Sequence, residues 1–326
     1  MDARTSPASR MLADRDAMAA DVREGLTRSP QKSLPPKYFY DPIGSALFEI
    51  ITLLPEYGLT RAEERLLRAH GGEMLARLGA VELVAELGSG SGRKTRHVLD
   101  AATRRRPVRY RPIEISESAL AQCARELGDI PGLRIDGVAL DYLDGLHVIT
   151  AQRRASAPML VLFLGSTIGN FEPVAAHRFL ADIRRLLRPG DALLLGADLD
   201  KPVDRVLAAY DDPLGVTAAF NLNQLARINR ELGADFDLRR FRHEARFDAG
   251  ARAVEMHLRA LAPQAVRIPG AGVELTLREG ETIWTEVSHK YLADEVRALG
   301  TQAGFHCAGQ WCDEEWPFAD TLLVAA

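Results

Sequence analysis

Three glycines at alternate positions, Gly88, Gly90 and Gly92, follow a short apolar run that ends in Glu86. A segment with helical character, 95–103, comes next, so the stretch predicts a strand, a tight turn and a helix. Glycine lets the backbone bend sharply and lets a flat ligand lie against the main chain, where a side chain would collide. The start of the helix adds N–H groups that have no partner within the helix. The turn therefore predicts a small-molecule site.

Three kinds of site use such a turn, and the spacing separates them. A phosphate-binding loop needs a glycine directly before Lys94-Thr95, but Arg93 stands there. A dinucleotide fold needs G-x-G-x-x-G, and the same Arg93 occupies its last position. The first motif of S-adenosylmethionine-dependent methyltransferases resembles [ED]-x-G-x-G-x-G, which residues 86–92 match at every fixed position. The motif alone favours a methyltransferase and leaves a dinucleotide binder or a plain βα turn open.

Acidic residues end the next two predicted strands. Glu114 ends one, and a carboxylate with two adjacent acceptor oxygens can take both ribose hydroxyls of a nucleoside. Asp141 followed by Tyr142 ends the other, and an acid beside an aromatic ring suits adenine. One acid after a strand is usually a helix cap. Several in succession after the glycine turn favour a nucleoside site at the carboxyl edge of a parallel sheet.

The elements that must position these residues form an α/β pattern. Apolar runs predict strands at 81–87, 108–115, 133–140, 159–164 and 192–197, and helices at 94–103, 117–127 and 175–187. Continuous apolar strands separated by helices predict a parallel sheet covered on both faces. A helix at 292–303 and strands at 305–312 and 318–325 complete a Rossmann-like methyltransferase sheet.

A long insertion separates strand 192–197 from helix 292–303. It contains helical stretches and strand-like runs, at 202–209, 215–232, 242–247, 253–261 and 272–277. The N-terminal part predicts helices at 10–26 and 43–51, and a capping box of Thr60 and Glu63 that opens a helix to about residue 77. Two prolines predict an extended, non-helical segment at 32–41.

We expect the insertion to fold with residues 1–60 as a second, discontinuous α+β lobe over the strand ends. The expected domains are 62–198 plus 291–326 for S-adenosylmethionine, and 10–61 plus 199–290 for the substrate.

Composition bounds the class of protein. The 326 residues are 47% hydrophobic and 26% charged with a net charge of −4, which favours a globular protein without a nucleic-acid partner. Cys123, Cys307 and Cys312 show no metal-ligand spacing and no disulfide framework. No apolar run is long enough for a membrane span and no signal peptide is visible, so we expect a cytoplasmic protein without metal or membrane partner.

Several segments together point to one family. They read KSLPPKYFYD at 32–41, LPEY at 54–57, FLGSTIGN at 163–170, AYDD at 209–212, TAAFN at 217–221 and TEVS at 285–288. With the glycine turn, they resemble the histidine-specific methyltransferases of ergothioneine biosynthesis, over about residues 20–320. GSTIGN and TEVS are far more specific than the glycine turn.

The resemblance implies a monomeric, two-lobed enzyme. It would place three methyl groups from S-adenosylmethionine on the α-amino nitrogen of L-histidine and so form hercynine. By position, the cofactor would contact Gly88, Lys94, Glu114, Asp141 and Tyr142. Histidine would contact Tyr57, Asn170, Tyr210, Glu286 and Ser288, with Tyr40 beside the α-amine.

These residue types suit the implied chemistry. Methyl transfer from a sulfonium is an in-line displacement that needs an uncharged, well-oriented amine. Tyr40 and Asn170 are polar but uncharged, so they orient the amine without favouring its protonated form. Glu286 and Ser288 share one strand face at i and i+2 and would bind the two imidazole nitrogens. Tyr210 would donate to the substrate carboxylate. Alternation places His289 on the opposite face, which favours a structural role.

Other functions remain open at this point. The same transfer to another amino acid is the nearest alternative, followed by a nicotinamide-dependent oxidoreductase and a non-catalytic S-adenosylmethionine-binding regulator. Two departures from the family pattern stand out. Glu114 replaces an expected Asp, and EEWP within 311–318 replaces a looser turn that contains glycine.

Overall fold

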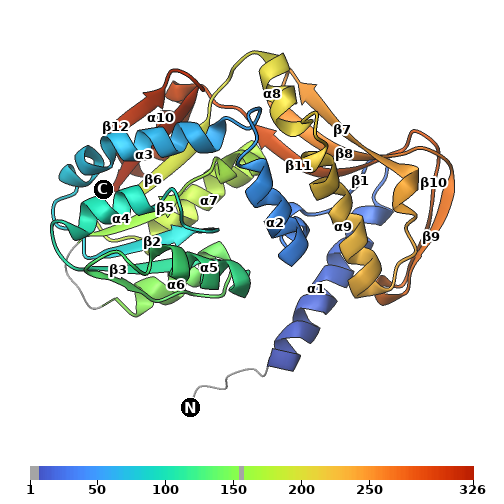
Figure 1. The fold of residues 1–326 in the computed structure, drawn as a ribbon, viewed down its shortest axis with the longest axis horizontal. Helices are drawn as coiled ribbons and strands as arrows, with labels where there is room; N and C mark the ends of the chain where they lie inside the picture. The colour runs from blue at the N-terminus through green and yellow to red at the C-terminus, as the bar shows by residue number, and fades with distance from the viewer. Residues whose placement is uncertain (1–6, 154–157) are drawn as a thin grey trace. The chain divides into compact units, whose positions relative to one another are not determined.

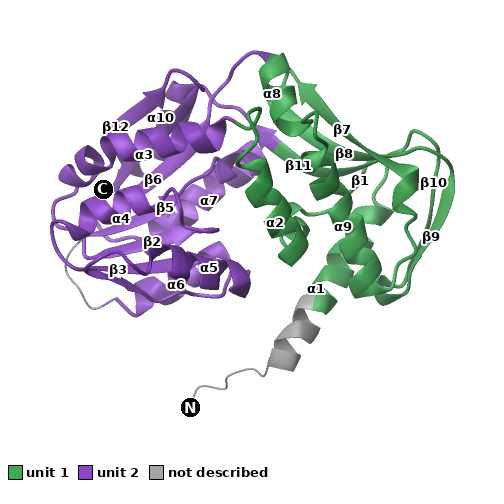
Figure 2. Ribbon diagram, in the orientation of Figure 1, with its two compact units in different colours: residues 1–57, 203–287 green, residues 58–202, 288–326 purple. Residues whose placement is uncertain are grey.

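The structure, a computed structural model, describes residues 7–153 and 158–326 (Figure 1). The chain divides into two compact units, each assembled from separate segments (Figure 2). Unit 1 comprises Met1–Tyr57 and Val203–Val287, and unit 2 comprises Gly58–Pro202 and Ser288–Ala326. The assignment of one unit to the cofactor and the other to the substrate stays a prediction.

Unit 2 contains a seven-stranded sheet in the order β12-β13-β6-β5-β2-β3-β4. Its strands are β2 (Leu83–Leu87), β3 (Val108–Ile113), β4 (Leu133–Ile135), β5 (Met159–Phe163), β6 (Ala192–Asp198), β12 (Phe305–Asp313) and β13 (Phe318–Ala325). The first five pair in parallel, and β13 runs antiparallel to β6 and to β12. The predicted α/β methyltransferase-like sheet is confirmed.

One strand is shorter than predicted. β4 ends at Ile135, because Asp136 and Gly137 interrupt the apolar run, and only an isolated bridge from Ile113 to Val138 continues the pairing. Asp and Gly are both unfavourable in strands.

The helices of unit 2 are α3 (Leu59–Ala76), α4 (Arg96–Thr103), α5 (Glu117–Leu127), α6 (Tyr142–Ala151), α7 (Pro173–Leu186) and α10 (Ala293–Gln302), with a 3₁₀ turn η2 (Thr167–Asn170). Buried side chains from α6, α7 and α10, including Leu146, Ile183 and Val296, join one core cluster with the central strands. α6 is absent from the sequence-based prediction, since its interior glycine and β-branched residues weaken the helical signal. Asp141 caps it, with Oδ1 accepting from the Asp144 N–H at 3.1 Å.

The predicted capping box at the start of α3 is wrong. Gly58 is the N-cap and makes no side-chain cap. The Glu63 side chain is fully buried instead, where its two oxygens accept the Gly165 N–H at 2.8 and 3.0 Å and its carboxylate pairs with the Lys94 ammonium. A buried carboxylate gains more from a cation and a backbone donor than from a solvent-exposed cap.

Unit 1 contains a four-stranded sheet in the order β1-β11-β8-β7 and a two-stranded hairpin. The sheet strands are β1 (Lys32–Ser33), β7 (Phe241–Asp248), β8 (Ala253–Ala260) and β11 (Thr282–His289), and the hairpin pairs β9 (Gln264–Ile268) with β10 (Val273–Leu277). The helices are α1 (Pro7–Thr27), α2 (Pro42–Ile51), α8 (Val203–Tyr210) and α9 (Val216–Leu232), with 3₁₀ turns η1 (Pro36–Phe39), η3 (Leu238–Arg240) and η4 (Pro269–Ala271).

Most of these elements agree with the sequence, apart from β9, which was missed, and the segment 32–41. That segment is extended only at its start, and Pro36 begins the turn η1, whereas a helix-free segment was predicted. Proline is well suited to the first position of a helical turn, because its missing N–H has no intrahelical partner there.

A buried amide joins α9 to the sheet of unit 1. The Asn221 side chain is fully buried; its Nδ2 donates to the His257 carbonyl at 3.1 Å and to His243 Nδ1 at 2.9 Å. Its Oδ1 accepts from Thr285 Oγ1 at 2.8 Å. Thr285 directly precedes Glu286, so these bonds fix the strand that carries a predicted substrate residue.

N221A tests this connection. It leaves the buried His243 Nδ1 without its donor, at a cost of about 1–3 kcal/mol for an unsatisfied group. Thr285 Oγ1 loses Asn221 but still donates to the Met256 carbonyl at 3.0 Å. We expect urea unfolding to show a loss in that range or above. The control E231A breaks only a surface ion pair with Arg227 in the same helix, worth at most about 0.5 kcal/mol. Equal stability of the two variants would contradict the role assigned to Asn221.

Candidate functional site

The glycine turn of unit 2 adopts a backbone that requires glycine. Gly88, Gly90 and Gly92 have φ values of +75°, +51° and +73°. A Cβ on Gly90 would meet no atom within 4 Å, so this part of the turn has room for a ligand. A Cβ on Gly92 would lie 2.8 Å from Cys123 Sγ, so that residue packs against α5. One glycine therefore leaves space, and another closes the turn on the core.

Glu86 ties the strand before the turn to the helix after it. Its fully buried carboxylate accepts from Thr95 Oγ1 at 2.7 Å and from the Tyr110 hydroxyl. Burial raises the pKa of Glu86 to about 7, although the bonds from Tyr110 and Thr95 oppose the rise. The motif acid is thus a structural connection within the turn.

Two predicted cofactor residues lie against the turn. A Cβ on Gly88 would come within 3.1 Å of the Tyr142 hydroxyl, and the ring of Tyr142 packs edge-on against Phe163 at 5.7 Å. Glu114 is half-buried at the end of β3, and its carboxylate accepts a long bond of 3.4 Å from the Gly90 N–H. Burial raises the pKa of Glu114. The structure therefore brings these two residues to the glycine turn.

The two remaining cofactor residues differ in surroundings. Asp141 is exposed at the start of α6, directly before Tyr142. The Lys94 ammonium pairs with Glu63 and lies beside Gly165, where an added Cβ would be 3.0 Å from Lys94 Nζ. Lys94 thus reaches from the glycine turn to the loop after β5.

Sequence reasoning missed two acids near Lys94. Glu63 resembles a helix cap in sequence, and Asp320 lies within a strand interpreted as part of the sheet edge. The Asp320 carboxyl is fully buried, and neither of its oxygens has a hydrogen-bond partner among the described residues. Burial, together with the charge of Glu63, raises the pKa of Asp320 well above its usual range. A buried acid whose neutral form is favoured therefore lies close to the Lys94–Glu63 pair. An acid inside an apolar run, FADTLLVA, is the one sequence signal that pointed to it.

The loop that carries Asn170 is held in a strained conformation. Gly165 and Ser166 have φ values of +77° and +58°, and the second is unfavourable for a residue with a side chain. Ser166 Oγ accepts from the Asp198 N–H at 2.8 Å, which fixes the loop to the end of β6. Strain of this kind persists where surrounding contacts enforce it.

The same loop packs against the end of β11. A Cβ on Gly169 would lie 2.8 Å from the His289 carbonyl oxygen and 3.3 Å from Ser288 Oγ. The structure thus places Asn170, the next residue, near Ser288. His289 Nε2 lies 3.9 Å from a Glu172 carboxylate oxygen, and its predicted structural role stays a prediction.

Ser288 contacts a group of buried ionic residues that sequence reasoning missed. We call Asp198, Lys201, Lys290 and Trp316 the Asp198 cluster. Asp198 Oδ1 accepts from Lys201 Nζ at 2.6 Å and from Trp316 Nε1 at 2.9 Å, while Oδ2 lies 3.0 Å from Lys290 Nζ. Burial alone would raise the pKa of Asp198, but the two lysines outweigh it and lower the pKa. Lys290 Nζ also donates to Ser288 Oγ at 2.9 Å.

In unit 1, ring contacts connect the three predicted tyrosines. The rings of Tyr40 and Phe48 lie 5.6 Å apart, those of Phe48 and Tyr57 6.2 Å, and those of Tyr57 and Tyr210 6.2 Å. Tyr57 and Tyr210 are buried. The structure therefore brings together residues that lie far apart in the sequence, in a row of neutral aromatic side chains.

Hydrogen bonds from α9 and β7 hold these rings in place. Asp41, next to Tyr40, caps α2 through the Gly44 N–H at 2.7 Å and accepts from Asn223 Nδ2 at 2.8 Å. His243 Nε2 donates to the Tyr210 carbonyl at 2.7 Å. Burial lowers the pKa of His243, which keeps its ring neutral and leaves Nδ1 as an acceptor.

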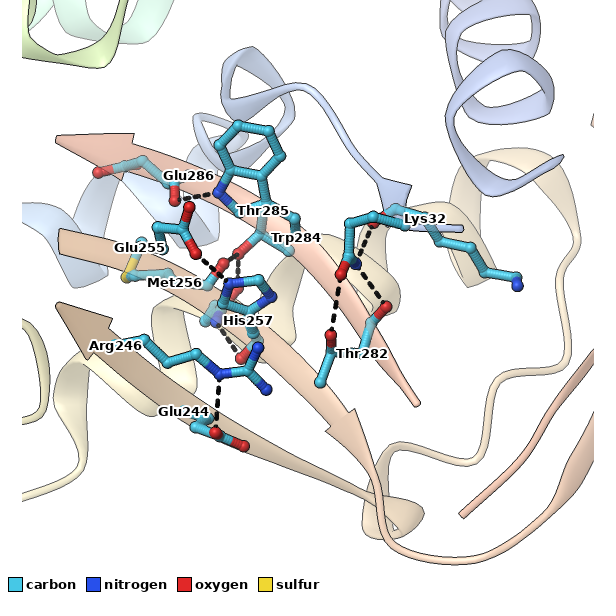
Figure 3. Close-up of polar contacts among 12 residues, drawn as sticks. Lys32, Glu244, Arg246, Glu255, Met256, His257, Thr282, Trp284, Thr285 and Glu286 are labelled. Atoms are coloured by element: carbon cyan, nitrogen blue, oxygen red, sulfur yellow. Dashed lines mark hydrogen bonds and ion pairs between the residues drawn. The ribbon is translucent and has the colours of Figure 1, made fainter. Parts of the chain in front are cut away.

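Glu286 lies on β11 beside other polar residues of unit 1 (Figure 3). Its backbone carbonyl accepts from Trp284 Nε1 at 2.9 Å. On β8, His257 Nε2 lies 2.9 Å from a Glu255 carboxylate oxygen. The boundary between the units falls at Val287, so Glu286 belongs to unit 1 and Ser288 to unit 2.

The described part of the chain contains neither a candidate metal-binding group nor a candidate membrane-spanning helix. Residues 7–153 and 158–326 contain no group of three or more His, Cys, Asp or Glu side chains arranged to hold a metal ion. Within the same residues, no helix is both long and apolar enough to cross a membrane.

Comparison with known proteins gives consistent results. A family described as "Histidine-specific methyltransferase, SAM-dependent" matches residues 18–325. A histidine N-alpha-methyltransferase of Mycolicibacterium smegmatis is 44% identical over 95% of this chain and 95% of its own. A histidine N-alpha-methyltransferase of Mycobacterium tuberculosis is 44% identical over 94% of this chain and 95% of its own. Ergothioneine biosynthesis protein 1 of Neurospora crassa is 30% identical over 86% of this chain, which spans 32% of that longer protein.

The raised pKa of Glu86 predicts a pH dependence of stability. Its pKa is about 7 in the folded protein against an ordinary 4.5, so folding favours the protonated form. This contribution is complete below pH 4.5 and is lost, at about 1.4 kcal/mol per pH unit, as the pH rises to about 7. E86Q cannot titrate, so its free energy of unfolding relative to wild type should increase between pH 5 and pH 8. Parallel profiles in denaturant unfolding would contradict this.

Proposed function

Because the chain belongs to the family of S-adenosylmethionine-dependent, histidine-specific methyltransferases, we propose that it trimethylates the α-amino group of L-histidine to hercynine. Hercynine formation would be the first step of ergothioneine biosynthesis. The observation that supports this function most strongly is 44% sequence identity to a histidine N-alpha-methyltransferase over 95% of both chains. The proposal also describes a monomeric, cytoplasmic enzyme that works without a metal ion. Gel filtration, and assays in the presence of a chelator, test the monomer and the metal independence.

The glycine turn of unit 2 fits the cofactor. The open space at Gly90 allows a flat group to approach the backbone, and the half-buried Glu114 carboxylate beside it suits ribose hydroxyls. Tyr142 presents a ring next to Gly88, and Asp141 lies exposed beside it for the adenine amine. Lys94 would bind the carboxylate end. When bound, S-adenosylmethionine supplies a methyl group on a positively charged sulfur.

The tyrosines and the asparagine proposed to bind histidine would orient the substrate, and their side chains carry no charge. Tyr57 and Tyr210 lie in a buried row of rings, where a phenol can donate to the substrate carboxylate without adding charge. Tyr40 and Asn170 would orient the amine, whose lone pair must face the methyl group. A neutral neighbourhood lets the amine lose its proton more readily than a carboxylate partner would, because a nearby anion favours the ammonium form.

Binding of the imidazole ring distinguishes methylation of histidine from the nearest alternative, methylation of another amino acid. The tyrosines would serve any amino acid, because they act on groups that all amino acids share. Glu286 and Ser288 would bind the imidazole nitrogens, and a site that pairs polar groups rejects analogues that lack them. Methylation of another amino acid would require other roles for these two residues.

The first test combines calorimetry and mass spectrometry. Titration with L-histidine in the presence of S-adenosylhomocysteine should show saturable binding, and S-adenosylmethionine should yield a product heavier by three methyl groups. E286A should weaken histidine binding by about 1–3 kcal/mol, as expected for a lost charged hydrogen bond. The control E274A removes an exposed acid of β10 and should bind normally. Cofactor binding without a response to histidine would reject the substrate.

Two alanine variants of the glycine turn test the cofactor site. Both place a side chain at positive φ, at a cost of about 1 kcal/mol. G90A meets no protein atom, so it should fold with little further loss but bind S-adenosylhomocysteine at least about tenfold more weakly. G92A overlaps Cys123 and Leu127, so it should lose stability in thermal unfolding. Unchanged cofactor affinity of G90A would argue against the cofactor lying on this turn.

A further inference from the structure

Ser288 has a neighbour that determines how its hydroxyl group can be used. Lys290 Nζ donates to Ser288 Oγ at 2.9 Å. The side chain of Lys290 is fully buried, and Ser288 is 2% exposed. Ser288 is the penultimate residue of β11, and Lys290 follows directly after the strand. Only one residue separates them, so a short stretch of backbone sets their contact. This is a fixed contact in the interior of unit 2.

An ammonium group has three donors and no acceptor. Ser288 Oγ must therefore accept from Lys290, and the proton of its own hydroxyl cannot point toward that nitrogen. Gly169 also lies close to Ser288, since a Cβ added to it would be 3.3 Å from Oγ. The hydroxyl proton is left to point elsewhere, as a donor.

The Asp198 cluster keeps Lys290 in place. Asp198 Oδ2 lies 3.0 Å from Lys290 Nζ, and the carboxylate is held on its other oxygen by Lys201 and Trp316. Nζ of Lys290 therefore has an acceptor that two other donors hold in place. Lys290 therefore remains a donor at a fixed position.

We propose that Lys290 is a positioning residue that fixes Ser288 as a hydrogen-bond donor to the substrate ring, so that the site selects a ring nitrogen with a free lone pair. The inference rests on the proposed function, in which Ser288 contacts the imidazole of histidine. It adds the direction of that hydrogen bond and assigns a role to Lys290.

The direction of the bond has consequences for selectivity. A neutral imidazole has one N–H donor and one nitrogen with a lone pair, so it can satisfy a donor hydroxyl. An indole or pyrrole ring has an N–H but no such lone pair, and a phenyl ring has neither. A doubly protonated imidazolium offers only donors. Each of these would leave the Ser288 hydroxyl without an acceptor, which is costly in a buried site.

A double-mutant cycle separates this role from a general effect on folding. K290M keeps the length of the side chain and removes its donor, while Asp198 retains Lys201 and Trp316 as partners. Binding of histidine is measured by calorimetry with S-adenosylhomocysteine present. S288A and K290M should each weaken it about tenfold, and the double variant should bind like S288A, because Lys290 acts through Ser288. Additive losses, or an unchanged affinity of K290M, would overturn the proposal.

K201M is the matched control. It removes the other lysine of Asp198 without touching Ser288, while Trp316 and Lys290 still hold the carboxylate, so it should lower the midpoint of thermal unfolding and weaken histidine binding less than K290M does. If K201M weakens histidine binding as much as K290M does, the effect belongs to the ion network and the proposal fails. S-adenosylhomocysteine affinity reports whether each variant retains a folded unit 2.

A second measurement does not depend on a Lys290 variant. The ring of 2-pyrrolylalanine carries an N–H and no lone pair that can accept a hydrogen bond. If Ser288 donates, S288A weakens histidine binding, and it leaves binding of 2-pyrrolylalanine unchanged or strengthens it, because the buried hydroxyl without an acceptor is removed. If Ser288 accepts, S288A weakens binding of the pyrrole analogue, and the proposal is wrong. Failure of the wild-type protein to bind histidine would instead remove the proposed function itself.

Discussion

The carboxylate of Asp198 holds together the segments of unit 2 that carry the residues predicted to bind the substrate histidine. It lies at the end of β6 and takes hydrogen bonds or ion pairs from Lys201, Trp316 and Lys290, which come from three separate stretches of the chain. Its backbone N–H reaches Ser166 in the strained loop. Removing one partner from a buried ion pair typically costs about 3–5 kcal/mol, because the remaining charge loses its compensation. The positions of Ser288 and of the loop that carries Asn170 therefore depend on an interaction between buried groups.

Buried polar groups fix the other parts of the candidate site in a similar way. Glu86 joins both ends of the glycine turn, Glu63 binds the loop after β5, and Asn221 connects α9 to the strand of Glu286. In each case the hydrogen bonds are specific in direction and lie in a low-dielectric interior, where an unmatched partner is costly. The residues proposed to meet ligands therefore project from segments with little freedom to move, which favours precise positioning of reacting groups.

Local patterns carried most of what the sequence revealed. The apolar runs of the parallel strands and the glycine turn are continuous in sequence, so periodicity and spacing predicted them. Glu63 was mistaken for a helix cap because its true partners, Gly165 and Lys94, are remote in the chain. Lys290 carried no sequence signal of its contacts, and the apolar run around Asp320 indicated a buried acid but not its neighbours, because only the fold supplies them. Segment resemblance, rather than periodicity, singled out Tyr40, Tyr57 and Tyr210, which the structure then places in one row of rings.

Placed beside the substrate amine, as proposed, that row of rings would treat a methylated nitrogen differently from a free amine. Each methyl group added to a nitrogen removes an N–H donor, and the final quaternary nitrogen has none, although it keeps a permanent positive charge. Aromatic faces attract such a cation without any hydrogen bond, by about 0.5–2 kcal/mol per favourable contact. For the proposed reaction, the rings of Tyr40 and Tyr57 would offer an attraction that survives each transfer. Intermediates with one or two methyl groups would then be retained by cation–π attraction to these rings. Hydrogen bonding to the nitrogen decreases with each methyl group.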